Sequence, residues 1–153
     1  MSDVDQTTDL RREIRIAASP ATVFALLTDA TRMRAWLADT VVAEAAPGGI
    51  FRMTDSGGRT IEGRYVEVVP DRKVVFTWGG VRGLAPGATT VEIELRPDGA
   101  GTLLLLRHSG VPAAARGAHD AGWQLGLSKL AAAAEGRDPG SPAFGAPGMA
   151  EHR

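Results

Sequence analysis

One long helical pattern near the C-terminal end constrains the fold of this chain most, because everything before it is short and mostly strand-like. Over residues 111–135 apolar side chains recur at helical spacing, with Trp123, Leu127 and Leu130 on one side. A sheet built from the preceding strands needs one of its faces covered. The helix is the only predicted element large enough to do so.

Seven segments before the helix show the alternation or the β-branched and aromatic content of strands. They span 10–17, 40–45, 50–54, 59–69, 73–78, 90–96 and 102–108. Ser19-Pro20 is typical of a helix start, and a second short helix is expected over 29–37. Turn residues such as Pro97-Asp98-Gly99 separate neighbouring strands, which favours antiparallel hairpins. The glycine-rich segment 79–88 is expected to be a long loop.

Composition excludes several classes of function. The chain has 153 residues, enough for one domain, and its 18 acidic and 17 basic side chains give a net charge of -1. Such a balance argues against nucleic acid and anionic membrane partners. Cysteine is absent, which excludes disulfides, thiolate catalysis and cysteine metal sites. With three histidines, one of them the near-terminal His152, we expect no metal and no cofactor.

The ends of the chain are expected to lie outside the domain. Residues 1–9 are polar and acidic, so we predict a disordered N-terminus rather than a targeting signal, and a cytoplasmic protein. No apolar run approaches the roughly 20 residues of a membrane span. Residues 10–136 form the predicted domain. The segment 137–153 is dense in Pro, Gly and Ala and is predicted to be a flexible tail.

The order of these elements resembles the helix-grip fold of the START-like (SRPBCC) superfamily. Within it, the chain resembles the group named after the activator of the heat-shock-protein-90 ATPase. The resemblance is carried by segments 19–24, 47–52, 63–70, 101–108 and 119–123. Ala30 departs from the pattern, because family members usually carry proline after the aspartate. The resemblance implies an α+β fold in which a curved antiparallel sheet of six to seven strands grips the long helix, with two short helices after the first strand.

The same resemblance implies a cavity between the sheet and the helix that binds apolar molecules. Eight residues are candidates to line it: Trp36, Phe51, Tyr65, Trp78, Leu106, His108, His119 and Trp123. For the three tryptophans, packing in the core or at its rim is the favoured interpretation. The two histidines could orient a polar group of a ligand or act as general bases, and the alternative is a structural role that ties the helix to a strand end.

Three functions remain open from the sequence. The first is binding of a small hydrophobic or aromatic molecule without chemistry. The second is an enzyme of the polyketide cyclase, aromatase or dehydratase type, in which His108, His119 and Tyr65 would supply acid–base groups. The third is a chaperone-interaction module, which the family name implies. A homodimer is an open alternative to a monomer. Fold alone does not choose between these functions.

Overall fold

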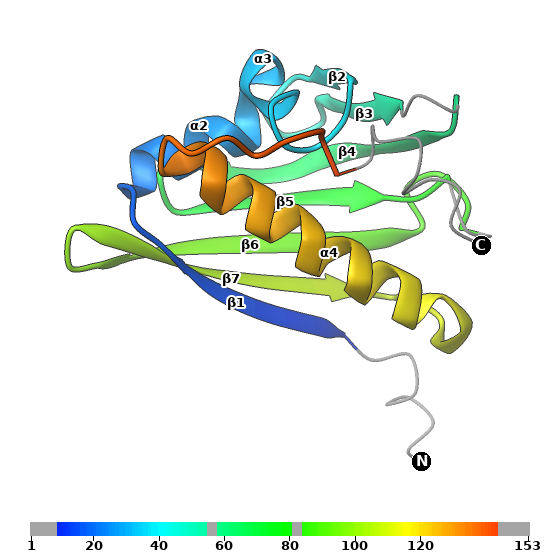
Figure 1. Ribbon diagram of the computed structural model, residues 1–153. Coiled ribbons are helices and arrows are strands. Elements are labelled where there is room, and N and C mark those ends of the chain that lie inside the picture. The colour runs from blue at the N-terminus through cyan, green and yellow to red at the C-terminus, as the bar shows by residue number, and fades with distance from the viewer. Residues whose placement is uncertain (1–8, 55–57, 81–83, 144–153) are drawn as a thin grey trace.

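The protein is described by a computed structural model covering residues 9–54, 58–80 and 84–143. A single antiparallel sheet of seven strands has the order β1-β7-β6-β5-β4-β3-β2 (Figure 1). The strands are β1 (Leu10–Ile16), β2 (Thr40–Ala43), β3 (Ile50–Thr54), β4 (Thr60–Val69), β5 (Lys73–Trp78), β6 (Thr89–Asp98) and β7 (Gly101–Ser109). The helices are α2 (Pro20–Thr28), α3 (Ala30–Met33) and α4 (Ala113–Ala134). This is the predicted α+β helix-grip architecture.

The strand β6 shows how the sequence pattern positions the core. Val91, Ile93 and Leu95 are buried, whereas the intervening Glu92 and Glu94 lie on the outer face. The partner strand β7 pairs in register from Thr90↔Ser109 to Asp98↔Gly101, so the predicted hairpin forms. Because successive side chains of a strand point to opposite faces, one face of the sheet is apolar and the other is charged.

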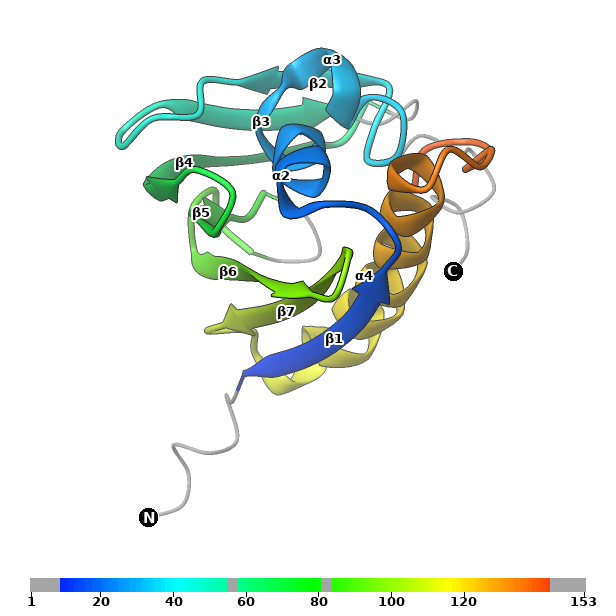
Figure 2. The same cartoon turned by 90° about the vertical axis from the view of Figure 1, so that its left-hand side faces the viewer.

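The helix α4 runs across the apolar face of the sheet, which curves around it and α2 (Figure 2). Trp123, Leu127 and Leu130 are buried, as their shared face predicts. An ion pair links α4 to the edge strand β1. Arg12 Nε and Nη2 of β1 donate to the two carboxylate oxygens of Asp120 of α4 at 2.9 and 3.1 Å. Such two-point pairing orients the guanidinium as well as attracting it.

Two expected elements differ from the structure. The second short helix, expected over 29–37, ends at Met33, and the following residues form turns that bury Trp36 and Leu37. In β4 the alternation fails because a bulge interrupts the pairing with β5 between Tyr65 and Glu67. An extra residue at a bulge turns the following side chain to the other face. Tyr65 is therefore buried, while Glu67 faces solvent and pairs with Lys73 at 3.4 Å.

The first part of the predicted tail packs against the domain. Lys129 Nζ donates to the Pro139 carbonyl at 2.9 Å, and the Ala143 amide donates to the Trp36 carbonyl at 2.8 Å. Ala143 is fully buried. The rest of the predicted tail and the predicted N-terminus before Asp9 lie outside the described residues. Within the described residues, no helix is long and apolar enough for a membrane span.

Candidate functional site

All eight predicted site residues lie in the interior. None has more than 5% of its surface exposed. Six of them meet on the inner face of the sheet as one group of rings, which Phe76 completes. We call this group the aromatic–histidine cluster; its members are Phe51, Tyr65, Phe76, Trp78, His108, His119 and Trp123. The predicted residues that make no ring contact within it are Trp36 and Leu106, whose contributions are described below.

Trp78 at the end of β5 is the centre of this cluster. Its ring centroid lies 5.0 Å from that of Trp123 on α4, 5.7 Å from His108 on β7 and 6.5 Å from His119. Phe51 stacks on its other side at 6.1 Å. Offset and edge-to-face contacts at these distances are the favourable geometries for aromatic pairs. The cluster therefore joins four strands and the long helix through ring contacts.

Hydrogen bonds fix the proton position on His108. Trp123 Nε1 has only a hydrogen to give, so it donates to His108 Nδ1, which must be the unprotonated nitrogen, at 3.0 Å. His108 Nε2 then carries the proton and donates to Thr89 Oγ1 at 2.7 Å, and Thr89 in turn donates to the Trp78 carbonyl at 2.8 Å. Both ring nitrogens of a neutral His108 are thus used inside the protein, and the ring ties α4 to the end of β7.

His119 is held in a different way. Its Nδ1 lies 3.0 Å from the carbonyl oxygen of Ala115, one turn earlier in α4, so this nitrogen carries a proton and donates. In the neutral ring Nε2 is then the acceptor nitrogen. The two histidine rings lie 5.3 Å apart in an edge-to-face arrangement. His119, at 5% exposed, is the nearer of the two to solvent, since His108 is fully buried.

His108 and Tyr65 are uncharged at pH 7. Burial, and secondarily the charge that His119 would carry, lowers the pKa of His108 to about 3. Burial also raises the pKa of the Tyr65 hydroxyl well above its ordinary value, so the phenol keeps its proton. That hydroxyl donates to the Leu27 carbonyl at 3.1 Å. These two rings are therefore uncharged, and their polar atoms bond to the protein itself.

Trp36 and Leu106, the two predicted site residues outside the cluster, are also buried. Trp36 Nε1 donates to the Leu26 carbonyl at 2.8 Å, which anchors the turn after α3. A Cβ atom placed on Gly126 of α4 would lie 3.7 Å from Trp36 and 4.0 Å from Trp123, so this glycine separates the two indoles. Leu106 is buried two residues before His108 on the inner face of β7.

Sequence reasoning missed two members of this site, Phe76 and Thr89. Phe76 lies in the predicted strand and contacts Phe51 at 4.4 Å between centroids. Thr89 is buried and joins His108 to the Trp78 carbonyl. Extending the alternation of Val91, Ile93 and Leu95 back by one step would have placed Thr89 on the inner face.

Three surface hollows are lined mostly by other residues; of the eight predicted site residues, Leu106 is among those lining one of them, on the outer face of the sheet. The largest, about 850 Å³, lies between the start of α2 and the β4–β5 turn, where Pro20, Val69 and Arg72 are among its lining residues. A second of about 410 Å³ lies between β1 and the end of α4. The third, on the outer face of the sheet, is described below. Among the described residues, no three His, Asp or Glu side chains are grouped to hold a metal ion.

A curved antiparallel sheet around a C-terminal helix, with a ring-lined interface between them, defines the protein as a helix-grip protein of the START-like class. The sequence pattern of the activator of Hsp90 ATPase homolog 1-like (AHSA1) proteins matches residues 17–135. The chain belongs to this family, which confirms the resemblance drawn from its sequence. No curated protein matches the chain.

Solved structures agree with this assignment. An AHSA1-like protein from Rhizobium etli is 38% identical with a TM-score of 0.70, over 95% of this chain and 89% of the other. The Aha1 dimer from Colwellia psychrerythraea gives 20% identity and a TM-score of 0.73, over 83% of this chain and 96% of the other. DynU16, a protein of the dynemicin biosynthetic locus, is 22% identical with a TM-score of 0.75, over 86% of this chain and 49% of the other. The last two likenesses concern the fold alone.

Proposed function

We propose that this protein binds a small, uncharged hydrophobic or aromatic molecule between the sheet and α4, beside the aromatic–histidine cluster. The concentration of aromatic rings carries the proposal. The chain has only eight Phe, Trp and Tyr residues, and five of them lie in this one cluster. Rings gathered at the junction of sheet and helix offer flat apolar surface, which is what a ligand of this class contacts.

The aromatic side chains of the cluster, together with the uncharged His108 and Tyr65, determine which ligands we expect to bind. A charged group placed among these rings would lose its hydration without gaining a counter-ion, which costs several kcal/mol. Uncharged molecules avoid this cost and gain about 25 cal/mol for each Å² of apolar surface they bury. We assign the contact with a hydroxyl group on the ligand to His119, the more exposed of the two histidines.

The enzyme alternative draws less support from the site. A cyclase or dehydratase needs acid–base groups that can reach the substrate. The Tyr65 hydroxyl is committed to the Leu27 carbonyl, and both nitrogens of His108 are committed to Trp123 and Thr89. The dynemicin-locus protein is a likeness of fold and transfers no reaction. The chaperone-interaction role, a homodimer and a cytoplasmic location stay predictions.

The test has two arms. Native mass spectrometry of protein purified from its own host asks whether a hydrophobic ligand is retained. Titration with naphthalene, 1-naphthol and naphthalene-1-sulfonate then asks which chemistry is accepted, with tryptophan fluorescence and melting temperature as readouts. A ligand that prefers the folded state raises the melting temperature as its concentration rises. We expect both uncharged probes to do so and the sulfonate to have little effect.

A variant pair examines the histidine. His119→Phe keeps a ring in place and removes the acceptor, so 1-naphthol should bind about 1–3 kcal/mol more weakly while naphthalene is unaffected. Ser128→Ala, which removes a hydroxyl bonded to the Leu125 carbonyl on the exposed side of α4, is the matched control. Equal loss for both probes would remove His119 from the ligand contact. No retained ligand and no response to any probe would refute the binding proposal.

A further inference from the structure

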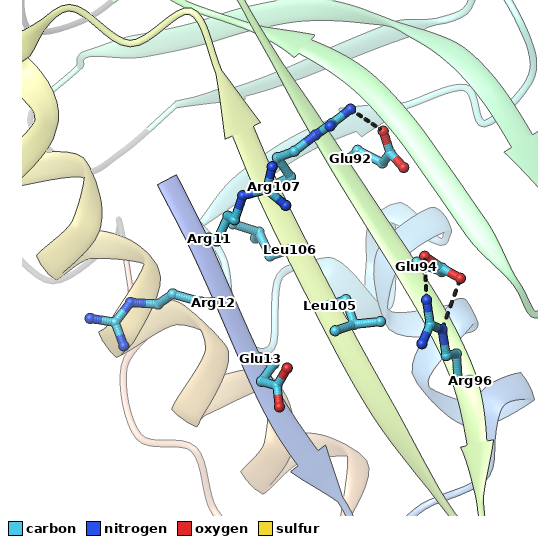
Figure 3. A pocket seen from close by; sticks show the side chains of 9 residues that line it. All are labelled: Arg11, Arg12, Glu13, Glu92, Glu94, Arg96, Leu105, Leu106 and Arg107. Carbon is cyan, nitrogen blue, oxygen red and sulfur yellow. Dashed lines mark hydrogen bonds and ion pairs between the residues drawn. The ribbon is translucent and has the colours of Figure 1, made fainter. Parts of the chain in front are cut away.

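Two arginines lie directly opposite each other on the outer face of the sheet, the face away from α4. Arg11 of β1 and Arg107 of β7 are partners in the antiparallel register. Like charges in this arrangement destabilise a sheet unless an anion lies between them. Figure 3 shows the two side chains on neighbouring strands at one end of a hollow.

The chain supplies such an anion from outside the strand. Asp9 precedes β1, and one oxygen of its carboxylate, Oδ2, lies 3.5 Å from Arg11 Nη2 and 3.7 Å from Arg107 Nε. Both contacts are longer than the 2.7–2.9 Å of a strong charge-assisted hydrogen bond. The Arg11 side chain is 70% exposed, so water competes for this pairing. The Asp9 carboxylate is therefore positioned as an occupant that another carboxylate can replace.

The hollow beside the two arginines has a graded chemistry. It measures about 430 Å³, a size that suits a small molecule. Leu105 of β7 lies in its middle, with Glu13 and Glu94 on either side (Figure 3). Arg107 also donates from Nη2 to Glu92 at 3.1 Å. The arginine pair at one end, next to the apolar Leu105, fits a single carboxylate joined to an apolar body; Glu94 is already paired with Arg96, which also lines the hollow, at 3.0 Å.

We propose that this hollow is a binding site for a small monocarboxylate, with the carboxylate between Arg11 and Arg107 and the apolar body over Leu105. Asp9 closes the site in the absence of ligand. The ligand and the Asp9 carboxylate compete for the same two guanidinium groups, so Asp9 sets the affinity. This site lies on the opposite face of the sheet from the proposed interior site and is independent of it.

Benzoate is a suitable probe, with benzyl alcohol as its uncharged counterpart and inorganic phosphate as an anion without an apolar body. Binding is measured by NMR at low ionic strength, from the arginine Nε–H signals and the Leu105 methyl signals. Benzoate should shift the signals of Arg11, Arg107 and Leu105 in a saturable way. Benzyl alcohol should give no saturable shift, and phosphate should bind more weakly than benzoate.

Variants distinguish benzoate binding at this site from general attraction of the anion to arginines. Asp9→Asn should lower the benzoate Kd about three- to tenfold, because the competing carboxylate is gone. Arg11→Gln or Arg107→Gln should raise it about tenfold or more. Arg52→Gln, which removes an arginine from the outer face of β3 where it pairs with Glu62, is the charge-matched control and should leave the Kd unchanged.

Three results would overturn the proposal. The first is benzoate affinity that does not change in Asp9→Asn and Arg107→Gln. The second is a uniform shift of all arginine signals, which is general screening rather than binding. The third is phosphate binding as tight as benzoate binding, which would contradict the assigned carboxylate class.

Discussion

Acidification is the perturbation to which the interior histidine pair responds most directly. The pKa of fully buried His108 is lowered to about 3, whereas the ordinary value is 6.5. At a pH between these two pKa values, the His108 ring is protonated in the unfolded chain but not in the folded protein. The free energy of unfolding therefore falls as the pH drops below about 6.5, and His108 contributes no such loss above that pH.

The size of the effect follows from the same two values. Each pH unit inside the window removes about 1.4 kcal/mol from the free energy of unfolding. At pH 5 the loss attributable to His108 is about 2 kcal/mol. A domain of this size is stable by roughly 5–15 kcal/mol, so the loss is a substantial part of the total. No carboxylate of the aromatic–histidine cluster offsets it, because the titratable group that faces the ring from α4 is His119.

Urea unfolding at pH 7.5, 6 and 5 measures the effect, with wild type compared against His108→Gln. Glutamine does not titrate and can still donate to Thr89, so the variant loses stability at every pH but should show a shallower slope below pH 6.5. Titrating groups distant from His108 are common to both proteins and cancel in the difference. Parallel stability curves for the two proteins would refute the reasoning, because they would mean that His108 protonates in the folded state as easily as in water.

Three further substitutions test the packing by chemical or thermal unfolding. Leu130→Ala on α4 should cost about 2–5 kcal/mol because the side chain is fully buried; an unchanged denaturation midpoint would contradict its core position. Gly63→Ala should cost about 2–4 kcal/mol, since the new Cβ would lie 1.9 Å from the Thr77 carbonyl oxygen and force β4 away from β5. A variant as stable as wild type would mean that the strands do not approach so closely. Asp71→Gly should instead stabilise by about 0.5–1 kcal/mol, because Asp71 has a φ of 62° in the β4–β5 turn, where glycine is unstrained. A loss of stability there would show that the aspartate side chain supports the turn.

The sequence by itself determined the elements whose signals are local. The strands of the β6–β7 hairpin follow from alternation and turn residues within a short stretch of chain, and α4 follows from its apolar spacing. The order of these elements indicated the helix-grip fold, and the family was identified from the resemblance of particular segments, such as 63–70 and 101–108. Local signals did not predict two features that depend on tertiary packing. The helix ends at Met33, so that Trp36 and Leu37 are buried in the following turns. The strand β4 has a bulge between Tyr65 and Glu67.

The candidate sites depended on tertiary structure, because their members come from distant parts of the chain. The eight cavity candidates could be named from the sequence, but not the partners that set their chemistry. Whether His108 can reach a ligand depends on Trp123 and Thr89, which lie on α4 and β6. The pairing of Arg11 with Arg107 joins strands at opposite ends of the sequence. Proton position, pKa and charge pairing arise from groups a few ångströms apart, and only the folded chain decides which groups those are.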